Sequence, residues 1–375
     1  MKAFWLKTRI VILVVLPLLS VAAAIVLLWN QYVFAKDLYL MAIFYLITTL
    51  GVTVGYHRML THQGFQTSRF VRGLFVIFGC MAFEGQPIGW AATHVMHHAH
   101  SDDDHDPHSP LHGFWHAHMG WLLSPENFAD PKVYAPHLLA DPVIRFIDRT
   151  CVLWMFLALA IPFALGGWTA LIWAGGVRIF LTTHVTWSVN SVCHTFGKRA
   201  FETTDESRNE WIVGLLAFGE GWHNNHHAFP KNAFHCLRWW QVDVSGLLIR
   251  TLEVLGLIWD VERVPEVSLE QHKVESLKRA SAVQDMRASL MQSIASAKKD
   301  LIEYVHSRMR APISEDELDD SVTACTNTLQ RLQEIQRKIR VARHLRRQRL
   351  DAYFREVQQL VSAAKERMTR QRQAV

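Results

Sequence analysis

Three long runs of apolar residues contain no charged side chain. They cover residues 10–35, 38–56 and 151–177, and about 20 such residues suffice to cross the hydrocarbon core of a bilayer as a helix. Gly166 and Gly167 divide the third run. We therefore expect an all-α membrane protein with four transmembrane helices in two hairpins, at about 10–30, 38–56, 150–166 and 168–187.

Basic residues lie at the open ends of both predicted hairpins. They precede the first hairpin, follow it and flank the second one, at Lys2, Lys7, Arg9, Arg58, Arg69, Arg72, Arg145, Arg149, Lys198 and Arg199. The first run is longer than a signal-peptide core of roughly 7–15 residues, so we interpret it as a membrane anchor. The positive-inside rule then places both termini in the cytoplasm, and we expect a bacterial inner membrane.

Polar residues inside apolar segments refine this topology. The segment 73–89 is short and contains Glu84, which favours a shallow interfacial helix over a further crossing. Arg178 and His184 fall within the fourth predicted helix. A charged side chain is costly in lipid, so we expect both to face the helix bundle or a wet cavity.

The sequence changes character after about residue 265, which we take as the end of a membrane domain (1–265). Residues 271–375 carry 21 Lys and Arg against 13 Asp and Glu, a balance of +8, whereas the whole chain has a net charge of +5. Ser314 and Glu317 form a capping-box pattern. Apolar residues then follow near-heptad spacing that Arg343 and Arg346 interrupt, at Val322, Leu329, Leu332, Ile339, Leu350, Tyr353, Val357 and Leu360.

The tail (266–375) is therefore predicted to be a basic helical extension. Two interpretations remain open: a solvated amphipathic helix, or a coiled coil through which the protein oligomerises. Basic charge next to a membrane domain indicates lipid headgroups or another protein as partners. We do not expect nucleic acid.

Histidine is abundant, with 21 residues, and three clusters have regular spacing. These clusters are His57 and His62; His94, His97 and His98; and His223, His226 and His227. In a helix, positions i, i+3 and i+4 share one face, so each H-x-x-H-H should direct its imidazoles into one space. Neutral imidazole suits iron, copper, zinc and nickel. Eight such ligands exceed the needs of one four-coordinate metal, which predicts a site for two metals.

The remaining candidate residues are interpreted more simply. The Asp-rich stretch 100–118 contains six further histidines, of which one or two are expected to orient ligands. We expect His137, His184 and His235 to be structural, and His272, His306 and His344 to be solvated. The five cysteines form no C-x-x-C pair, so neither a zinc ribbon nor a fused rubredoxin is predicted.

The motifs together resemble the integral-membrane fatty acid desaturases, and most closely their delta-9 branch. The matching motifs are Gly55-Tyr56-His57-Arg58, Ser101-Asp102 through Asp106-Pro107-His108, Gly120-Trp121, Asn190-Ser191 with His194, and Gly221-Trp222 followed by His223-Asn224-Asn225-His226-His227. The resemblance covers residues 35–250 and excludes the tail. It implies four transmembrane helices beneath a cytoplasmic, histidine-rich di-iron cap.

The resemblance also implies ligands and chemistry. One iron would be bound by His57, His62, His94, His98 and His226, and the other by His97, His194, His223 and His227, with Asn190 reaching it through a water. The implied reaction is O2-dependent insertion of a cis double bond, at delta-9, into a saturated acyl chain for unsaturated fatty acid biosynthesis. Electrons would come from a separate ferredoxin or cytochrome b5 class protein, because the chain has no His-Pro-Gly-Gly motif and no ferredoxin-type cysteine set.

The acyl carrier and the reaction class leave alternatives open. Animal acyl-CoA desaturases place Arg-Asp before the second box and Arg-Lys after Gly-Trp-Leu-Leu. Here these positions are Ala92-Thr93 and Pro125-Glu126, which favours a lipid-linked acyl chain over acyl-CoA because phosphate-binding cations are missing. The alternatives to a desaturase are a di-iron membrane hydroxylase of alkyl or carotenoid substrates and a non-enzymatic metal transporter or sensor.

Overall fold

The computed structural model describes residues 14–124, 127–308, 310, 315–341 and 347–373. The chain divides into two compact units, Met1–His272 and Lys273–Val375. Several predicted features lie outside the described residues: the start of the first apolar run with its preceding basic residues, Pro125 and Glu126, the Ser314 cap, and Arg343 with Arg346.

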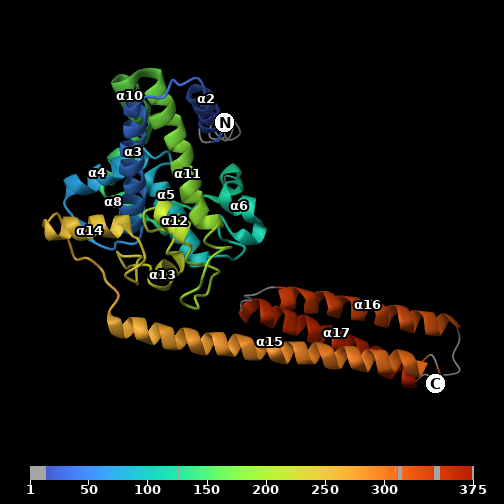
Figure 1. Ribbon diagram of the computed structural model, residues 1–375. Coiled ribbons are helices and arrows are strands. Elements are labelled where there is room, and N and C mark those ends of the chain that lie inside the picture. The colour runs from blue at the N-terminus through green and yellow to red at the C-terminus, as the bar shows by residue number, and fades with distance from the viewer. Residues whose placement is uncertain (1–13, 125–126, 309, 311–314, 342–346, 374–375) are drawn as a thin grey trace. The chain divides into compact units, whose positions relative to one another are not determined.

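Long apolar helices form one end of the first unit (Figure 1). Helix α2 (Leu16–Trp29) precedes α3 (Ala35–Leu50), which continues as the π-helical stretch η2 (Gly51–Thr61). Later, α10 (Cys151–Ala170), the π-helical η6 (Leu171–Val177) and α11 (Arg178–Ser191) follow one another. Within the described residues, Ala35–Thr61 and Cys151–Ser191 are long and apolar enough to cross a membrane, while α2 is apolar but shorter.

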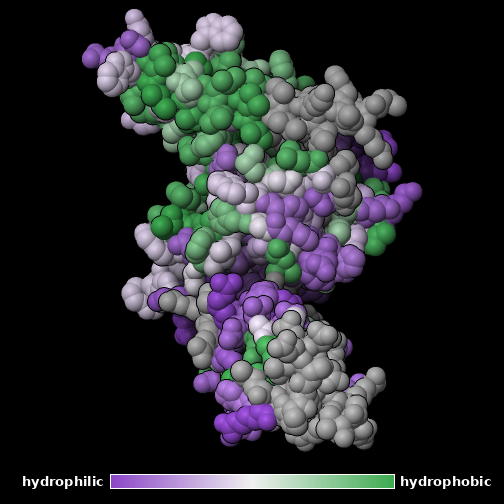
Figure 2. Space-filling model, turned by 90° about the vertical axis from the view of Figure 1, so that its right-hand side faces the viewer, coloured by the Kyte–Doolittle hydropathy of each residue, from purple (hydrophilic) through white to green (hydrophobic). Residues whose placement is uncertain are grey.

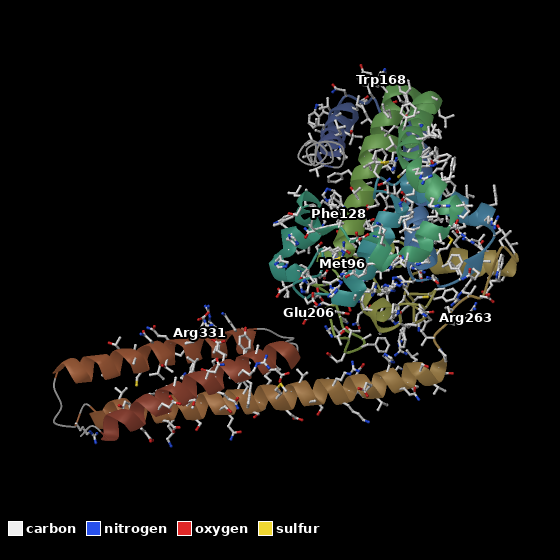
Figure 3. All side chains as sticks on the ribbon, turned by 180° about the vertical axis from the view of Figure 1, so that it is seen from behind. Met96, Phe128, Trp168, Glu206, Arg263 and Arg331 are labelled. Atoms are coloured by element: carbon white, nitrogen blue, oxygen red, sulfur yellow. The ribbon has the colours of Figure 1, made fainter. Side chains whose placement is uncertain are left out.

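The second of these segments reverses direction, as the glycine pair predicted. Gly167 has φ 72° and ψ −155°, a non-helical conformation that interrupts α10 and that glycine adopts without a steric penalty. Figure 3 places Trp168, beside this turn, at the opposite end of the unit from Glu206 and Arg263. On the face shown in Figure 2, apolar side chains gather over the upper end of the unit and hydrophilic ones below it. The protein is therefore membrane-associated, with one apolar and one polar end.

Arg178 faces the bundle, as its position in an apolar run predicts. It has no exposed surface, and its guanidinium donates to the carbonyl oxygens of Ala174, Met81 and Ala158 at 3.0, 2.9 and 3.4 Å. His184 is half-buried and bonds to His118, with 3.0 Å between His118 Nε2 and His184 Nδ1. Both polar side chains in this segment thus have partners inside the protein.

Helix α4 (Arg69–Cys80) packs unusually close to η2. A Cβ atom on Gly51 would lie 2.3 Å from the backbone nitrogen of Gly79, and one on Gly55 would lie 2.8 Å from the carbonyl oxygen of Phe75. Glycine is thus required for this approach. The predicted shallow segment 73–89 is α4 followed by a turn that contains Glu84, and it then enters α5 (Pro87–His100).

Short elements enclose the polar end of the first unit. They are η3 (Pro110–His112), α6 (Phe114–His118), η4 (Gly120–Leu123), α7 (Pro131–Tyr134), α8 (Pro136–Ala140), α9 (Pro142–Arg149), α12 (Trp211–Leu216), α13 (His223–Ala228) and α14 (Val244–Val254). Strand β1 (Gln66–Thr67) pairs antiparallel with β2 (Ile258–Trp259). This pairing ties the segment after η2 to the segment after α14.

The second unit contains three helices with a core of their own. Helix α15 (Glu266–Arg308) enters it from the first unit and is followed by α16 (Glu315–Val341) and α17 (Arg347–Gln373). Leu290, Ile294, Leu332, Ile339 and Leu350 are fully buried in its core. The heptad positions at 329–360 therefore pack within one chain, across two helices, and do not form the single long helix that the spacing suggested.

Candidate metal centre

Each histidine cluster lies on a helix at the polar end of the apolar bundle. His57 is in η2 and His62 directly follows it; His94, His97 and His98 are in α5; His223, His226 and His227 are in α13. His194 lies just beyond α11. Elements from both halves of the first unit therefore meet here, although they are up to 170 residues apart in sequence.

The nine histidines fall into two groups that could each hold a metal ion. One group is His57, His62, His94, His98 and His226; the other is His97, His194, His223 and His227. Within each group the candidate ligand atoms all lie within 4.8 Å of one another. Helical spacing alone was too coarse here, because each H-x-x-H-H divides its imidazoles between both groups.

Carboxylates hold one ring nitrogen of four of these histidines. The distances from Nδ1 are 3.0 Å for His97 to Asp106, 3.0 Å for His194 to Asp102, 2.8 Å for His227 to Asp205 and 2.5 Å for His57 to Glu220. A carboxylate accepts the Nδ1 hydrogen, which fixes the tautomer and leaves a lone pair on Nε2. The four Nε2 atoms are therefore prepared to bind a cation.

The other ring nitrogens lack suitable hydrogen-bond partners within the described residues. His62 Nε2, His97 Nε2 and His227 Nε2 are buried and unpaired. Elsewhere Nε2 atoms face one another, at 3.1 Å for His57 and His226, 3.0 Å for His226 and His98, and 2.9 Å for His194 and His223. Because a neutral imidazole has only one N–H, such contacts oppose lone pairs unless a cation lies between them. The residues thus fit two metal ions with imidazole ligands.

Burial keeps these imidazoles in the form that binds metals. Desolvation, followed by repulsion from neighbouring histidines, lowers the pKa of His94, His98 and His226 well below its ordinary value. At neutral pH these rings are therefore uncharged and have a lone pair available.

A buried ionic network supports the first group from below. Arg58 is 1% exposed and contacts the carboxylates of Glu220, at 3.0 Å, and Asp243, at 2.9 Å. Glu220 in turn binds His57. Gly219, with φ 116°, precedes Glu220, and a Cβ there would lie 2.3 Å from an Asp243 oxygen. The network thus fixes the carboxylate that orients His57.

Some residues proved closer to the site than the sequence suggested. His235, expected to be structural only, lies 3.4 Å from Glu220, with its ring 4.5 Å from that of His226. His108 is buried beside His97, with ring centroids 4.3 Å apart, as expected for one or two histidines of this stretch. Asp205 and Glu220 were missed, because an acidic residue in an irregular segment has no distinctive spacing. His118 bonds instead to Ser191 and His184.

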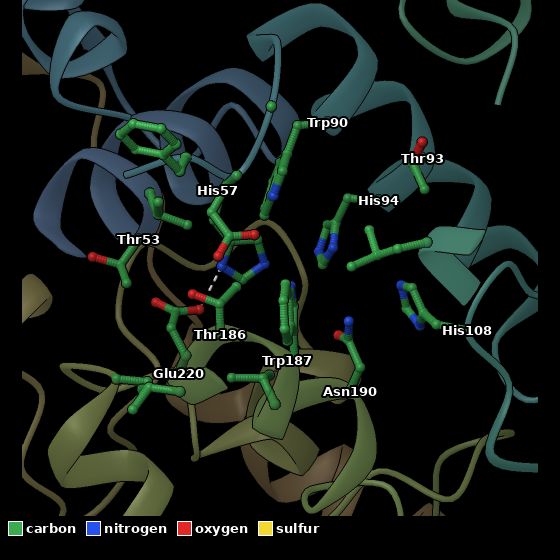
Figure 4. Close-up of a pocket in the computed structure, with 18 of the residues that line it drawn as sticks. Thr53, His57, Trp90, Thr93, His94, His108, Thr186, Trp187, Asn190 and Glu220 are labelled. Atoms are coloured by element: carbon green, nitrogen blue, oxygen red, sulfur yellow. Dashed lines mark ion pairs between the residues drawn. The ribbon is translucent and has the colours of Figure 1, made fainter. Parts of the chain in front are cut away.

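A cavity of about 180 Å³ opens beside both groups. His57, His94 and His223 line it together with the aromatic side chains of Trp90 and Trp187. Figure 4 shows Trp90, His94, Trp187 and Asn190 around this space, with Glu220 paired to His57. Asn190, predicted to act through a water, thus lies on the cavity wall. The site can bring an apolar substrate against the histidine groups.

A membrane-associated helical protein with two histidine groups beside an apolar cavity is typical of a membrane oxidoreductase. The family model "Fatty acid desaturase" matches residues 36–244. The chain is 41% identical over 259 residues, 68% of each chain, to the palmitoyl-monogalactosyldiacylglycerol delta-7 desaturase of Arabidopsis thaliana chloroplasts. It is 42% identical to the sn-1 stearoyl-lipid 9-desaturase of Anabaena variabilis, covering 57% of this chain and 79% of that one.

A third relative is the acyl-CoA 5-desaturase of Anemone leveillei, which is 37% identical over 67% of this chain and 78% of its own. The chain belongs to the fatty acid desaturase family, and it is an oxidoreductase of lipid metabolism. This confirms the family resemblance to the delta-9 branch that the motifs indicated. The relatives act on both lipid-linked and CoA-linked chains, so they leave the carrier open.

Proposed function

We propose that the protein is an O2-dependent desaturase that introduces a cis double bond at delta-9 of a saturated, glycerolipid-linked acyl chain. The cavity carries this proposal most directly. Its wall combines metal-ligand candidates with Val52, Phe83, Trp90 and Trp187, so an alkyl chain has an apolar path to the histidine groups.

The two groups are proposed to hold two iron ions, with the ligands divided as the family resemblance implies. When bound, iron supplies the O2 activation needed to remove hydrogen from two adjacent methylenes. The described residues provide what surrounds it. Asp102, Asp106, Asp205 and Glu220 fix the imidazoles, Asn190 is proposed to hold a water, and the aromatic wall excludes bulk solvent.

The absence of cations where acyl-CoA enzymes carry them supports a lipid-linked substrate. Ala92 is completely buried, and Thr93 lines the cavity. Neither side chain can neutralise a CoA phosphate. Two of the relatives described above are named for lipid-linked substrates, which agrees with this proposal.

The proposed topology has four membrane-crossing helices, formed by α2, α3 with η2, and the two arms on either side of Gly167. Both termini and the metal groups would lie in the cytoplasm, at a bacterial inner membrane. There a separate ferredoxin or cytochrome b5 class protein would deliver the two electrons.

Lipid analysis tests this function. The chain is expressed in a host without delta-9 desaturase, together with each class of electron donor, and new double bonds are located by mass spectrometry in glycerolipid and acyl-CoA fractions. We expect a cis-9 monoene that appears first in glycerolipid. Appearance first on CoA would overturn the carrier, a hydroxylated product would identify a hydroxylase, and iron binding without any acyl product under both donors would indicate a transporter or sensor.

A further inference from the structure

A second pocket, separate from the metal-side cavity, lies at the start of α14. It is open, has a volume of about 490 Å³, and includes Arg238, Trp239, Leu247 and Arg250 in its wall. It shares no lining residue with the cavity beside the histidine groups. Whatever binds here would therefore not be the reacting part of the substrate.

The polar groups in this wall that are not basic are already satisfied. The Asp243 carboxylate binds Arg58, at 2.9 and 3.0 Å, and accepts from the Gly246 backbone at 2.7 Å. The Gln241 oxygen accepts from the backbone N–H groups of Leu237 and Arg238, at 2.6 and 2.9 Å. Neither side chain has a charge left to offer a ligand.

The two arginines remain available. No carboxylate lies within salt-bridge distance of Arg238 or Arg250 among the residues that the structure describes. The Arg250 guanidinium lies 4.9 Å from the centroid of the Phe234 ring, which restrains it without neutralising it. The pocket therefore presents two guanidinium groups, whose planar donor arrays match the oxygens of a phosphate.

The rim of the pocket has the chemistry of a bilayer interface. Trp239 is 96% exposed, Leu247 66% and Val254, further along α14, 87%. Helix α14 runs across the direction of α3, near the end of the apolar bundle that is remote from the Gly167 turn (Figure 1). Exposed tryptophan and leucine beside arginine are typical of helices that lie at the headgroup level.

We propose that this pocket binds the phosphodiester headgroup of an anionic membrane lipid. Arg238 and Arg250 pair with the phosphate, while Trp239 and Leu247 contact the glycerol and upper acyl region. A zwitterionic lipid binds more weakly because its own cation opposes the two arginines. This site rests on the membrane association of the first unit and not on the proposed regiospecificity or carrier.

The test uses the purified full-length, metal-loaded protein in a neutral detergent. Melting temperature and native mass spectrometry are followed while dioleoyl phosphatidylglycerol or dioleoyl phosphatidylcholine is added. The Arg238→Gln/Arg250→Gln variant is compared with Lys231→Gln/Arg145→Gln, which removes the same charge from exposed positions outside the pocket. We expect the first variant to bind phosphatidylglycerol about tenfold or more weakly and the control to match the wild type.

Further arms keep the outcomes distinct. Arg238→Lys/Arg250→Lys retains charge but loses the planar donor arrays, so we expect intermediate binding; it also serves if the glutamine variant does not fold. Equal binding of both lipids, or an equal loss in the control variant, would overturn the proposal. Equal competition by millimolar inorganic phosphate or free CoA would also overturn it, because the pocket would then recognise a soluble phosphate.

Discussion

Glu84 provides a sharp test of how the cavity wall is built. It lies in the turn between α4 and α5 and lines the cavity beside the histidine groups. Its Oε1 atom is buried and has no hydrogen-bond partner among the described residues. Burial raises the pKa of this carboxyl from 4.5 to about 8, against a smaller lowering effect of Thr186. The side chain is therefore mostly a neutral acid at pH 7.

The raised pKa links stability to pH in a defined direction. Because the folded pKa is higher than the unfolded one, the neutral carboxyl contributes fully below about pH 4.5, and its contribution is lost as pH rises through about 8. At about 1.4 kcal/mol for each tenfold change in protonation ratio, the loss between pH 6 and pH 8 is about 2 kcal/mol. For a unit of this size that corresponds to roughly 4–8 °C in melting temperature.

The assay compares wild type with Glu84→Gln, which keeps the shape and cannot ionise. Melting temperatures of the metal-loaded proteins are measured in one detergent at pH 6 and pH 8. We expect the wild type to lose several degrees relative to the variant as the pH rises. Glu262→Gln, an exposed residue of the same unit, should behave like the wild type. Parallel pH profiles for wild type and Glu84→Gln would refute the assignment of a buried neutral acid.

Three further predictions concern the metal groups and the tail. His98→Ala and His227→Ala should each abolish desaturation and reduce bound iron while the protein stays in the membrane; retained activity in either would contradict its role as a ligand. Asp205→Asn should weaken iron retention against a chelator by about 10–100-fold, whereas exposed Asp104→Asn should leave it unchanged, and equal retention would show that Asp205 does not orient His227. Removal of residues 273–375 should preserve desaturation per molecule, measured by lipid analysis, and an inactive but folded truncation would contradict this independence.

The sequence predicted the apolar helices and the histidine clusters because both follow short-range periodicity. A 3.6-residue repeat places His94 and His98 on one face of α5 without knowledge of any other element. The carboxylates could not be found in this way. Asp205 and Glu220 reach their histidines from irregular segments, where spacing along the chain does not determine distance in space. His235 was underestimated for the same reason.

The tail shows a different limit of sequence reasoning. Its heptad-like spacing correctly indicated buried apolar faces, since Leu332, Ile339 and Leu350 are in a core. Spacing does not reveal what covers such a face. Here α15 and α17 cover α16 within the same chain, so a pattern compatible with a coiled coil between subunits is satisfied internally.

The buried guanidinium of Arg178 has a consequence for biogenesis. Two of its acceptors, Ala158 and Ala174, belong to the same hairpin, but the third is Met81, from a segment that the ribosome makes almost a hundred residues earlier. An arginine at the centre of an inserting helix costs about 2.5–3.5 kcal/mol. Chain order supplies the Met81 carbonyl before the charge that needs it. The amino-terminal half can thus act as an intramolecular receptor for the second hairpin as it leaves the translocon.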